Sequence, residues 1–310
     1  MAKRVLLVGC QGFVGRHVLQ ALHAAGWSVY GYDLAADCTD ARLDHYFCGQ
    51  LQDRACLDAA LAHTKANLVV SLAAYNAGDG MVSSSEQDDD QAIQVNALGL
   101  KTLLDAARQA SVARVLWASS TVVYGAAGRY PPGPVNEDAP CRPLLSYGLS
   151  KVLAEQIACF QRDRYGLEVC GLRLPLVFGP GRWYRGALGS LADVFAQAGP
   201  GRKLRLDGPS EPFDFLYAVD AGRAFATAAD CPKPLAAVYN VAGFVTDYEA
   251  IASALEQRFE GLQIERHLSP SDWVLPLLDG HYFQHDTGFQ AAFDLARAVD
   301  DFLHHAGAPS

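Results

Sequence analysis

The sequence has little that would suit a membrane or a nucleic-acid partner. No stretch approaches the roughly 18–20 uninterrupted apolar residues that a membrane-spanning helix needs. Basic residues are outnumbered, with 25 Lys and Arg against 34 Asp and Glu, and they are scattered along a chain of formal charge −9. A nucleic-acid surface needs clustered positive charge, so we expect neither kind of partner.

Paired cysteines are also missing, since the eight cysteines include no C-x-x-C pair. Several, such as Cys159 and Cys170, stand among apolar neighbours and are expected to be buried thiols. The first four residues pass directly into a predicted strand, which leaves no room for a signal peptide. We therefore expect the protein in the reducing cytoplasm.

Half of the 310 residues are apolar, which is enough for a large core. Short apolar runs alternate with stretches of helical character, and the runs show no in-out alternation, as expected of parallel strands buried on both faces. This order predicts an α/β fold with a doubly wound parallel sheet. The predicted strands lie near 4–8, 28–32, 68–72, 113–118 and 168–174, and the predicted helices near 14–25, 53–62, 92–109 and 147–165.

A glycine-rich turn follows the first predicted strand, with Gly9, Gly12 and Gly15 in the spacing G-x-x-G-x-x-G. Such glycines let the backbone approach a pyrophosphate, and the helix that follows presents N–H groups and a positive dipole end. The second predicted strand ends in Asp33, eighteen residues after Gly15. A carboxylate there can accept both hydroxyls of an adenosine ribose and would repel a 2′-phosphate. The segment therefore predicts NAD rather than NADP as cofactor.

Tyr147 and Lys151 stand four residues apart, so they share one face of the predicted helix. A phenol has a pKa near ~10, and a nearby ammonium favours its phenolate form. A serine of the pair Ser119-Ser120, at the end of a predicted strand, can hold a substrate oxygen. This arrangement suits removal of a proton from an alcohol while a hydride leaves its carbon. On an arbitrary helix the two residues would be an ordinary surface pair. The glycine turn earlier in the chain favours the interpretation as a catalytic pair.

Together these features resemble the extended short-chain dehydrogenase/reductase family, the NAD-dependent epimerase/dehydratase group. The resemblance covers about residues 3–245 and includes several further segments in the family's order. These segments are 69–74, 96–99, 115–125, 172–180, 214–220 and 239–243.

The resemblance implies a Rossmann domain over residues 1–178, to which 213–245 returns. It also implies a smaller C-terminal substrate-binding lobe, formed by 179–212 and 246–310. The family is one of enzymes, and its catalytic residues correspond here to Ser120, Tyr147 and Lys151. Tyr147 would take the hydroxyl proton, Ser120 would position that oxygen, and Lys151 would lower the pKa of Tyr147 while holding the nicotinamide ribose.

The NAD contacts implied by the resemblance come from the glycine turn, from strand ends and from the catalytic helix. They are Gly9, Gln11, Gly12, Phe13, Val14, Gly15, Asp33, Gln50, Leu51, Leu72, Ala73, Ala74, Asn96, Tyr147, Lys151, Pro175 and Val177. Family members often dimerise through two helices, here near 96–109 and 147–165, so we expect a homodimer. Apolar residues on these helices, such as Leu100 and Leu153, are equally explained by packing on the sheet.

Two departures from the family bear on the substrate. Phe213 stands where nucleotide-sugar epimerases carry an arginine that contacts the substrate pyrophosphate, and Leu176 stands where they often carry an asparagine. Loss of a charge-assisted contact favours a sugar-like alcohol or small polyol over a nucleotide sugar. Thr121 and Val122 replace the Asp-Glu pair of the dehydratase branch, so we expect no dehydration.

Other cations could compensate for the missing arginine, so a nucleotide-sugar 4-epimerase remains an alternative. Arg182 and Arg185 flank two aromatic residues and would suit a carboxylate or phosphate, next to a substrate held by Ser120 and Thr121. A surface turn with a buried tryptophan would explain the same cluster. Net oxidation and epimerisation use the same residues, and the sequence leaves both open.

A third possibility is a sensor or scaffold that binds NAD without turnover, although such a protein need not keep Ser120, Tyr147 and Lys151. No metal site is expected. The histidines of the C-terminal tail lack suitable spacing to other ligands; these are His281, His285, His304 and His305.

Overall fold

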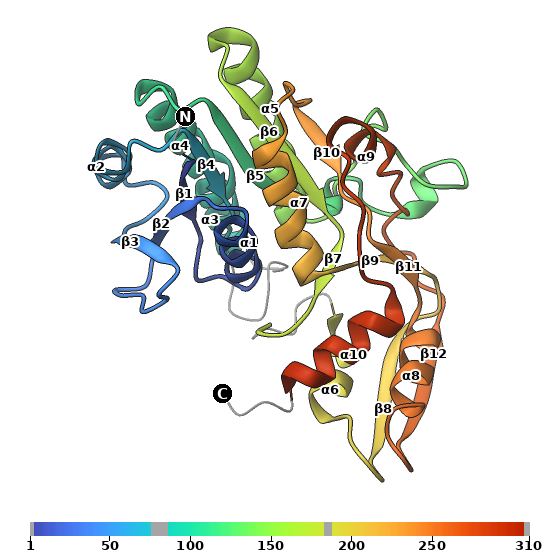
Figure 1. Cartoon of the computed structure of the whole chain (residues 1–310). Coiled ribbons are helices and arrows are strands. Elements are labelled where there is room, and N and C mark those ends of the chain that lie inside the picture. The colour runs from blue at the N-terminus through green and yellow to red at the C-terminus, as the bar shows by residue number, and fades with distance from the viewer. Residues whose placement is uncertain (1–2, 76–85, 183–187, 307–310) are drawn as a thin grey trace.

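The structure, a computed structural model, describes residues 3–75, 86–182 and 188–306. Its largest unit is a seven-stranded parallel sheet in the order β10-β6-β5-β4-β1-β2-β3 (Figure 1). The predicted doubly wound sheet is therefore confirmed. Its strands are β1 (Arg4–Val8), β2 (Ser28–Asp33), β3 (Leu43–Cys48), β4 (Leu68–Ser71), β5 (Arg114–Ser120), β6 (Glu168–Leu174) and β10 (Val238–Asn240).

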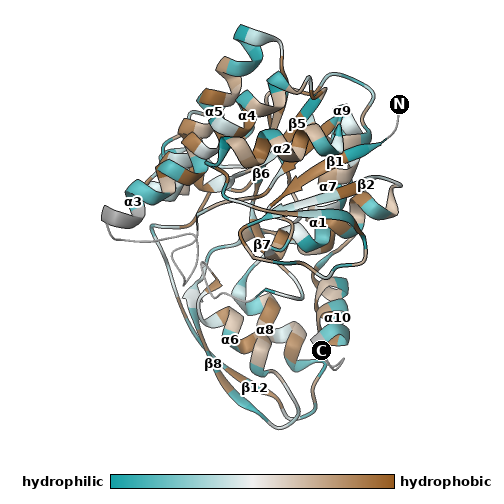
Figure 2. Ribbon diagram, turned by 90° about the vertical axis from the view of Figure 1, so that its left-hand side faces the viewer, coloured by the Kyte–Doolittle hydropathy of each residue, from teal (hydrophilic) through white to brown (hydrophobic). Residues whose placement is uncertain are grey.

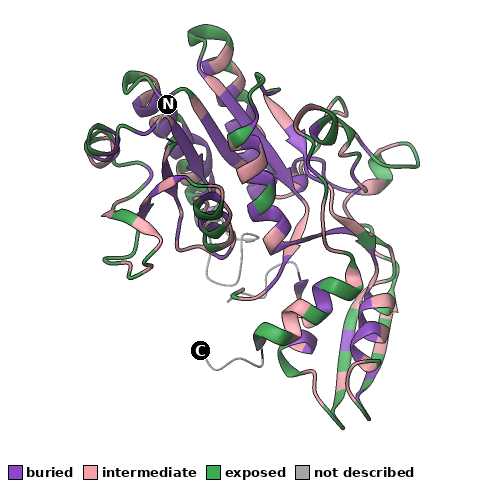
Figure 3. Cartoon of the chain, in the orientation of Figure 1, coloured by how far each residue is buried: buried purple, intermediate pink, exposed green. Residues whose placement is uncertain are grey.

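Helices cover both faces of this sheet because its central strands are apolar on both sides. Val5 and Leu7 of β1 pack with α1 (Phe13–Ala24) and α7 (Ala218–Asp230). Leu6 and Val8 point to the opposite face, which is covered by α2 (Arg54–Thr64), α4 (Leu100–Gln109) and α5 (Ser146–Tyr165). Figure 3 shows the resulting buried sheet between partly exposed helices.

Helices α1 and α7 approach closely because a glycine lies at their contact. A Cβ on Gly222 would lie 2.4 Å from the His17 carbonyl oxygen. On the other face, the segment before α4 consists of α3 (Glu86–Ala92) and a π-helical stretch, η1 (Ile93–Gly99). The helix predicted over 92–109 is therefore two elements, and only its second half is a regular α-helix.

A smaller lobe lies beside the carboxyl ends of the large sheet (Figures 1 and 2). It contains α6 (Ser190–Gln197), α8 (Tyr248–Glu256), α10 (Leu295–Ala306) and the two-stranded sheet of β8 (Lys203–Pro209) and β12 (Gln263–Ser269). A three-stranded sheet leads into it, formed by β7 (Leu176–Phe178), β9 (Phe213–Tyr217) and β11 (Phe244–Thr246). Stacked aromatic rings fill the lobe's core, where Phe178 lies 4.0 Å from Phe195 and 5.3 Å from Phe215 between ring centroids.

One part of the tail that we assigned to the lobe packs elsewhere. Phe283 of α9 (His281–Thr287) is buried in the core beside the large sheet, 5.3 Å from the Tyr239 ring. The Tyr239 hydroxyl also donates a 2.6 Å hydrogen bond to Asp286. Helix α9 therefore covers the end of the sheet at β10, while α8, β12 and α10 belong to the lobe. The division into two domains as a whole stays a prediction.

The described residues offer neither a membrane span nor a metal cluster. No helix in these ranges combines the length and apolar character needed to cross a membrane. Within the same ranges, no three His, Cys, Asp or Glu side chains are grouped so that they could hold a metal ion.

Candidate active site

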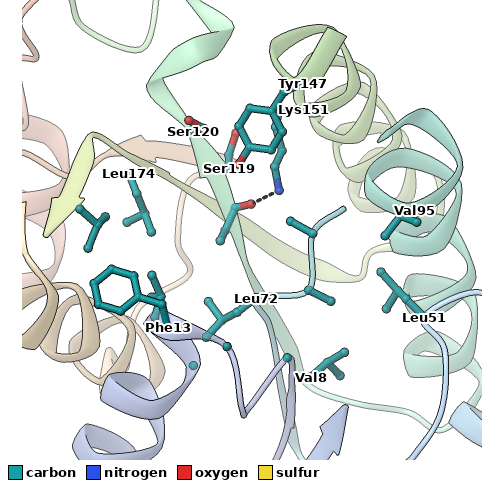
Figure 4. Close-up of a pocket in the computed structure, with 18 of the residues that line it drawn as sticks. Val8, Phe13, Leu51, Leu72, Val95, Ser119, Ser120, Tyr147, Lys151 and Leu174 are labelled. Carbon is teal, nitrogen blue, oxygen red and sulfur yellow. Dashed lines mark hydrogen bonds between the residues drawn. The ribbon is translucent and has the colours of Figure 1, made fainter. Parts of the chain in front are cut away.

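A cavity of about 510 Å³ opens at the carboxyl ends of β1, β4, β5 and β6. The strand order reverses between β1 and β4, and this is where an open α/β sheet leaves a crevice for a ligand. Figure 4 shows side chains from all four strand ends facing this space. Its lining runs across the sheet from Asp33 at the end of β2 to Tyr147 beside β5, a span of neighbouring strand ends that suits a dinucleotide.

The glycine turn between β1 and α1 forms one wall of the cavity. Gly9 has a φ of +81°, and a Cβ there would lie 2.7 Å from the Ala73 backbone nitrogen. A Cβ on Gly15 would lie 2.0 Å from the Gly9 carbonyl oxygen. Only glycine fits at these two points, so the turn folds back on the start of α1 and leaves its backbone facing the cavity. This cradle fits a pyrophosphate.

Asp33 lines the far end of the cavity, and backbone groups fix its carboxylate. Its Oδ2 accepts a 2.8 Å hydrogen bond from the Gln11 backbone nitrogen, and its Oδ1 accepts one of 2.7 Å from the Leu34 nitrogen. The Gln11 side chain points away from the cavity and donates to the Asp37 carbonyl and the Tyr46 hydroxyl. Gln11 therefore braces Asp33, while its direct contact with a cofactor stays a prediction.

The three predicted catalytic residues meet at the other end of the cavity. Tyr147 and Lys151 lie on the first turns of α5, and Ser120 ends β5. The Lys151 ammonium donates a 2.8 Å hydrogen bond to the Ala118 carbonyl and lies 5.5 Å from the centre of the Tyr147 ring (Figure 4). The geometry therefore brings phenol, ammonium and serine hydroxyl to one place, as the sequence predicted.

Burial dominates the electrostatics of this end of the cavity. The Lys151 side chain is only 3% exposed. Loss of hydration lowers its pKa from the ordinary 10.5 to about 8, while the carboxylate of Glu155 acts in the opposite direction. The lysine is thus still mainly an ammonium at neutral pH.

Fifteen of the seventeen predicted cofactor contacts line the cavity, and the exceptions are Gln11 and Asn96. Asn96 is buried behind the wall, where its Oδ1 accepts from the Tyr75 nitrogen and its Nδ2 donates to the Ser150 hydroxyl. It fixes η1 against the catalytic helix. Its predicted contact with NAD remains a prediction.

The proposed substrate residues are only partly brought together. Thr121, Leu176 and Arg182 line the cavity, whereas Arg185 lies outside the described residues. The Arg182 guanidinium donates a 2.6 Å hydrogen bond to the Val177 carbonyl and stands 5.9 Å from the Phe13 ring centre. It therefore lies beside the glycine turn.

Phe213, at the position of the family's arginine, packs edge-on against Phe215 and Tyr248 of the lobe, at 5.6 Å in each case. Its side chain therefore contributes to the aromatic core.

Sequence reasoning missed Gln91, Val95 and Leu275, which also line the cavity. The segment that carries Leu275 is held by backbone bonds, including one of 2.7 Å from the Ala127 nitrogen to the Val274 carbonyl. Its end is fixed by a 2.6 Å bond from the Leu278 nitrogen to the Asp214 carboxylate. No local sequence pattern marks these residues, because tertiary contacts alone bring them here.

Substitution of Lys151 by methionine should stabilise the fold at neutral pH. Below pH 8 the folded chain keeps a buried charge that the unfolded chain holds in water, since the folded pKa is lowered to about 8. The free energy of unfolding should therefore rise by up to roughly 3 kcal/mol at pH 7. The gain should shrink from pH 8 to pH 10.5, because the wild-type lysine is then already neutral in the folded state.

Urea unfolding of wild type and Lys151→Met at pH 7 and pH 10 measures this difference. Lys101→Met is the matched control, because Lys101 is an exposed residue of α4 paired with Asp105. A Lys151→Met variant less stable than wild type at pH 7 would contradict the expectation.

Comparison with known proteins agrees with this geometry. Residues 5–242 match the profile of the NAD dependent epimerase/dehydratase family. The UDP-glucose 4-epimerase of Mycolicibacterium smegmatis is 30% identical over 239 residues, which cover 73% of this chain and 72% of that protein. Several other curated relatives align over about half of their own length.

Solved structures are similar over nearly the whole chain. The UDP-glucose 4-epimerase of Thermus thermophilus, in complex with NAD, is 25% identical with a TM-score of 0.79, covering 99% of this chain and 100% of that one. An L-threonine dehydrogenase of Cupriavidus necator, 24% identical, shares the fold with a TM-score of 0.85 over 97% and 99% of the two chains. The profile match and the Mycolicibacterium relative show that the chain is an NAD-dependent enzyme that belongs to the NAD dependent epimerase/dehydratase family.

Proposed function

We propose that the enzyme oxidises or epimerises an alcohol carbon of a sugar-like or small polyol substrate. The observation that supports this most is the meeting of Ser120, Tyr147 and Lys151 in a cavity that the glycine turn and Asp33 also line. When bound, NAD supplies the nicotinamide ring that accepts or returns the hydride. The glycine turn would hold its pyrophosphate, and the Asp33 carboxylate would accept the hydroxyls of its adenosine ribose.

The protein's own residues would handle the proton. Tyr147, as phenolate, takes the proton of the substrate hydroxyl, and Ser120 donates a hydrogen bond to the same oxygen. The Lys151 ammonium, 5.5 Å from the Tyr147 ring centre, stabilises the phenolate through space in a site of low dielectric. If the ketone leaves, the reaction is a net oxidation; if it turns over and regains the hydride on its other face, the reaction is an epimerisation.

The charge around the cavity favours a substrate without a diphosphate. Among the described lining residues, the cations are Lys151 and Arg182. Lys151 would stabilise the Tyr147 phenolate. Arg182 lies beside the glycine turn, where the cofactor's own pyrophosphate would lie. Leu176 and Leu275 add apolar surface. Among the described residues, a second diphosphate would therefore find no further charge-assisted partner.

The second candidate is a nucleotide-sugar 4-epimerase. The 30% identical relative from Mycolicibacterium smegmatis bears the name UDP-glucose 4-epimerase, and that specific observation favours it. The same residues would perform the proton and hydride steps, so only the binding group of the substrate distinguishes the two.

We also propose a homodimer that forms through η1 and α5. Apolar side chains are exposed along this face, from Leu98 on η1 to Leu149, Leu153 and Phe160 on α5. The spacing of the three α5 residues places them on one side of the helix. Burial of such a stripe against a second copy would stabilise the pair.

All eight cysteines are free thiols, which supports the proposed location in the cytoplasm.

Replacement of Tyr147 by phenylalanine should lower kcat by about 10³-fold, because it removes only the hydroxyl that transfers the proton. The dissociation constant of NAD should stay within a few-fold of wild type, as measured by calorimetry. Tyr165→Phe is the matched control, since Tyr165 is an exposed residue at the far end of the same helix. Retention of substantial turnover by Tyr147→Phe would reject the proposed role.

Small alcohols should raise the melting temperature of the NAD-loaded protein, whereas UDP- and dTDP-sugars should not. The reason is that, in the described lining, the substrate end of the cavity has no cation besides Lys151 and Arg182. A thermal-shift panel of polyols, sugar acids and nucleotide sugars tests this. A clear shift with a UDP-sugar, followed by its 4-epimerisation, would instead support the second candidate.

Leu153→Glu should convert the dimer into a monomer, because it places a charge in the centre of the apolar face. Light scattering after size-exclusion chromatography measures the mass. Leu34→Glu changes another exposed leucine, one outside this face, and should leave the dimer intact. A monomeric wild-type protein would contradict the proposed interface.

A further inference from the structure

A buried ion pair lies behind the proposed catalytic residues. Glu155 of α5 receives two hydrogen bonds from Arg173 of β6, one of 2.7 Å from Nη2 to Oε2 and one of 2.9 Å from Nε to Oε1. The two side chains are only 7% and 4% exposed. Removal of two charges from water is expensive, and such a pair is weak evidence of a role in stability alone.

The carboxylate of this pair also connects the catalytic helix to the catalytic strand. The Ser119 hydroxyl, next to Ser120 at the end of β5, donates a 2.6 Å hydrogen bond to Glu155 Oε1. Along α5, Glu155 follows Lys151 by one turn and Tyr147 by two, so the three residues share one face of the helix. Any movement of α5 relative to β5 would break this bond.

Arg173 is itself fixed on its other side. Its Nη1 donates to the Tyr124 hydroxyl, and its guanidinium stands 4.9 Å from the centre of the Tyr124 ring. The Tyr124 hydroxyl in turn donates a 2.8 Å hydrogen bond to the fully buried Asn240 of β10. Glu155 is therefore held directly by Ser119 and Arg173, and Arg173 is held in turn by Tyr124 and Asn240.

The negative charge of the Glu155 carboxylate also acts on the Lys151 ammonium. Around that ammonium, α5 presents Tyr147 and Glu155, while β5 presents the Trp117 ring and the Ala118 carbonyl. Among the described residues, Glu155 is the charged group that raises the pKa of Lys151, against the larger lowering by burial.

We propose that Glu155 is a positioning residue for the reaction. Through Ser119 it sets the end of β5 against α5, and it places a carboxylate one helical turn from Lys151 on the same face of α5. This inference rests on the proposed function, because it concerns the geometry and charge of the same three residues.

Glu155→Gln tests the proposal, since the amide keeps an acceptor for Ser119 and removes the charge. The main measurement needs no substrate: the dissociation constant of NAD, followed by tryptophan fluorescence from pH 6 to 10. In wild type, affinity should fall with a midpoint near pH 8, the pKa to which burial lowers Lys151. In Glu155→Gln the midpoint should be lower by about one pH unit, because the field that favours the ammonium is gone. Turnover should fall about tenfold or more in kcat with little change in KM.

The matched control is Glu168→Gln. Glu168 pairs with Arg114 at 2.8 Å at the opposite ends of the same two strands, far from the catalytic side chains. Glu168→Gln should lower the melting temperature without moving the midpoint. If Glu155→Gln alone fails to fold, Glu155→Gln combined with Arg173→Met removes the uncompensated cation. Its midpoint should still lie below that of wild type, but by less than one pH unit, because the opposing field of the arginine is removed as well.

An unmoved midpoint in a folded Glu155 variant, or an equal movement in Glu168→Gln, would overturn the proposal. Failure of the proposed function would look different. In that case Tyr147→Phe would turn over as fast as wild type, while the midpoint of NAD binding would still respond to Glu155→Gln.

Discussion

Burial of a lysine ammonium at the inner end of the cavity is the constraint on which the rest of the site depends. A cation acts strongly on a neighbouring phenol only where water is excluded, and the same exclusion makes the cation costly. The chain meets both conditions by bringing α5 very close to the end of β5. A Cβ on Gly148 would lie 2.7 Å from the Val122 carbonyl, so a glycine is required at this contact. The Ala118 carbonyl then provides the hydrogen bond that the buried ammonium needs.

Much of the fold could be predicted because its signals are local. Runs such as Val5–Val8 are apolar without alternation, and a strand buried on both faces requires that pattern. Strand β3 (Leu43–Cys48) was missed because it is an edge strand of mixed polarity, with an aspartate and a histidine among its exposed residues. The packing of α9 against the large sheet could not be predicted either, because the contact of Phe283 with Tyr239 joins segments that are distant along the chain.

In the candidate site too, features with a local sequence signal could be predicted, and features that depend on distant contacts could not. The spacing of Tyr147 and Lys151 on one helix and the glycine spacing after β1 are local, so both could be predicted. The place of Leu275 in the cavity and the pairing of Glu155 with Arg173 depend on contacts between segments far apart in the sequence. No residue pattern predicts them. Gln11 is an intermediate case. The sequence predicted that Gln11 contacts the cofactor, which stays a prediction, and only the structure shows that its backbone nitrogen donates to Asp33.

The segment that places Leu275 in the cavity is anchored independently of the glycine turn. Its fixed points are the Ala127 and Leu278 nitrogens, with the carboxylate of Asp214, whereas the turn packs against β4 and the start of α1. Because the two walls share none of these partners, a substitution in one wall leaves the contacts that hold the other wall in place. Evolution can therefore exchange the side chains of one wall to admit new metabolites, generation after generation, while descendants inherit the redox machinery unaltered.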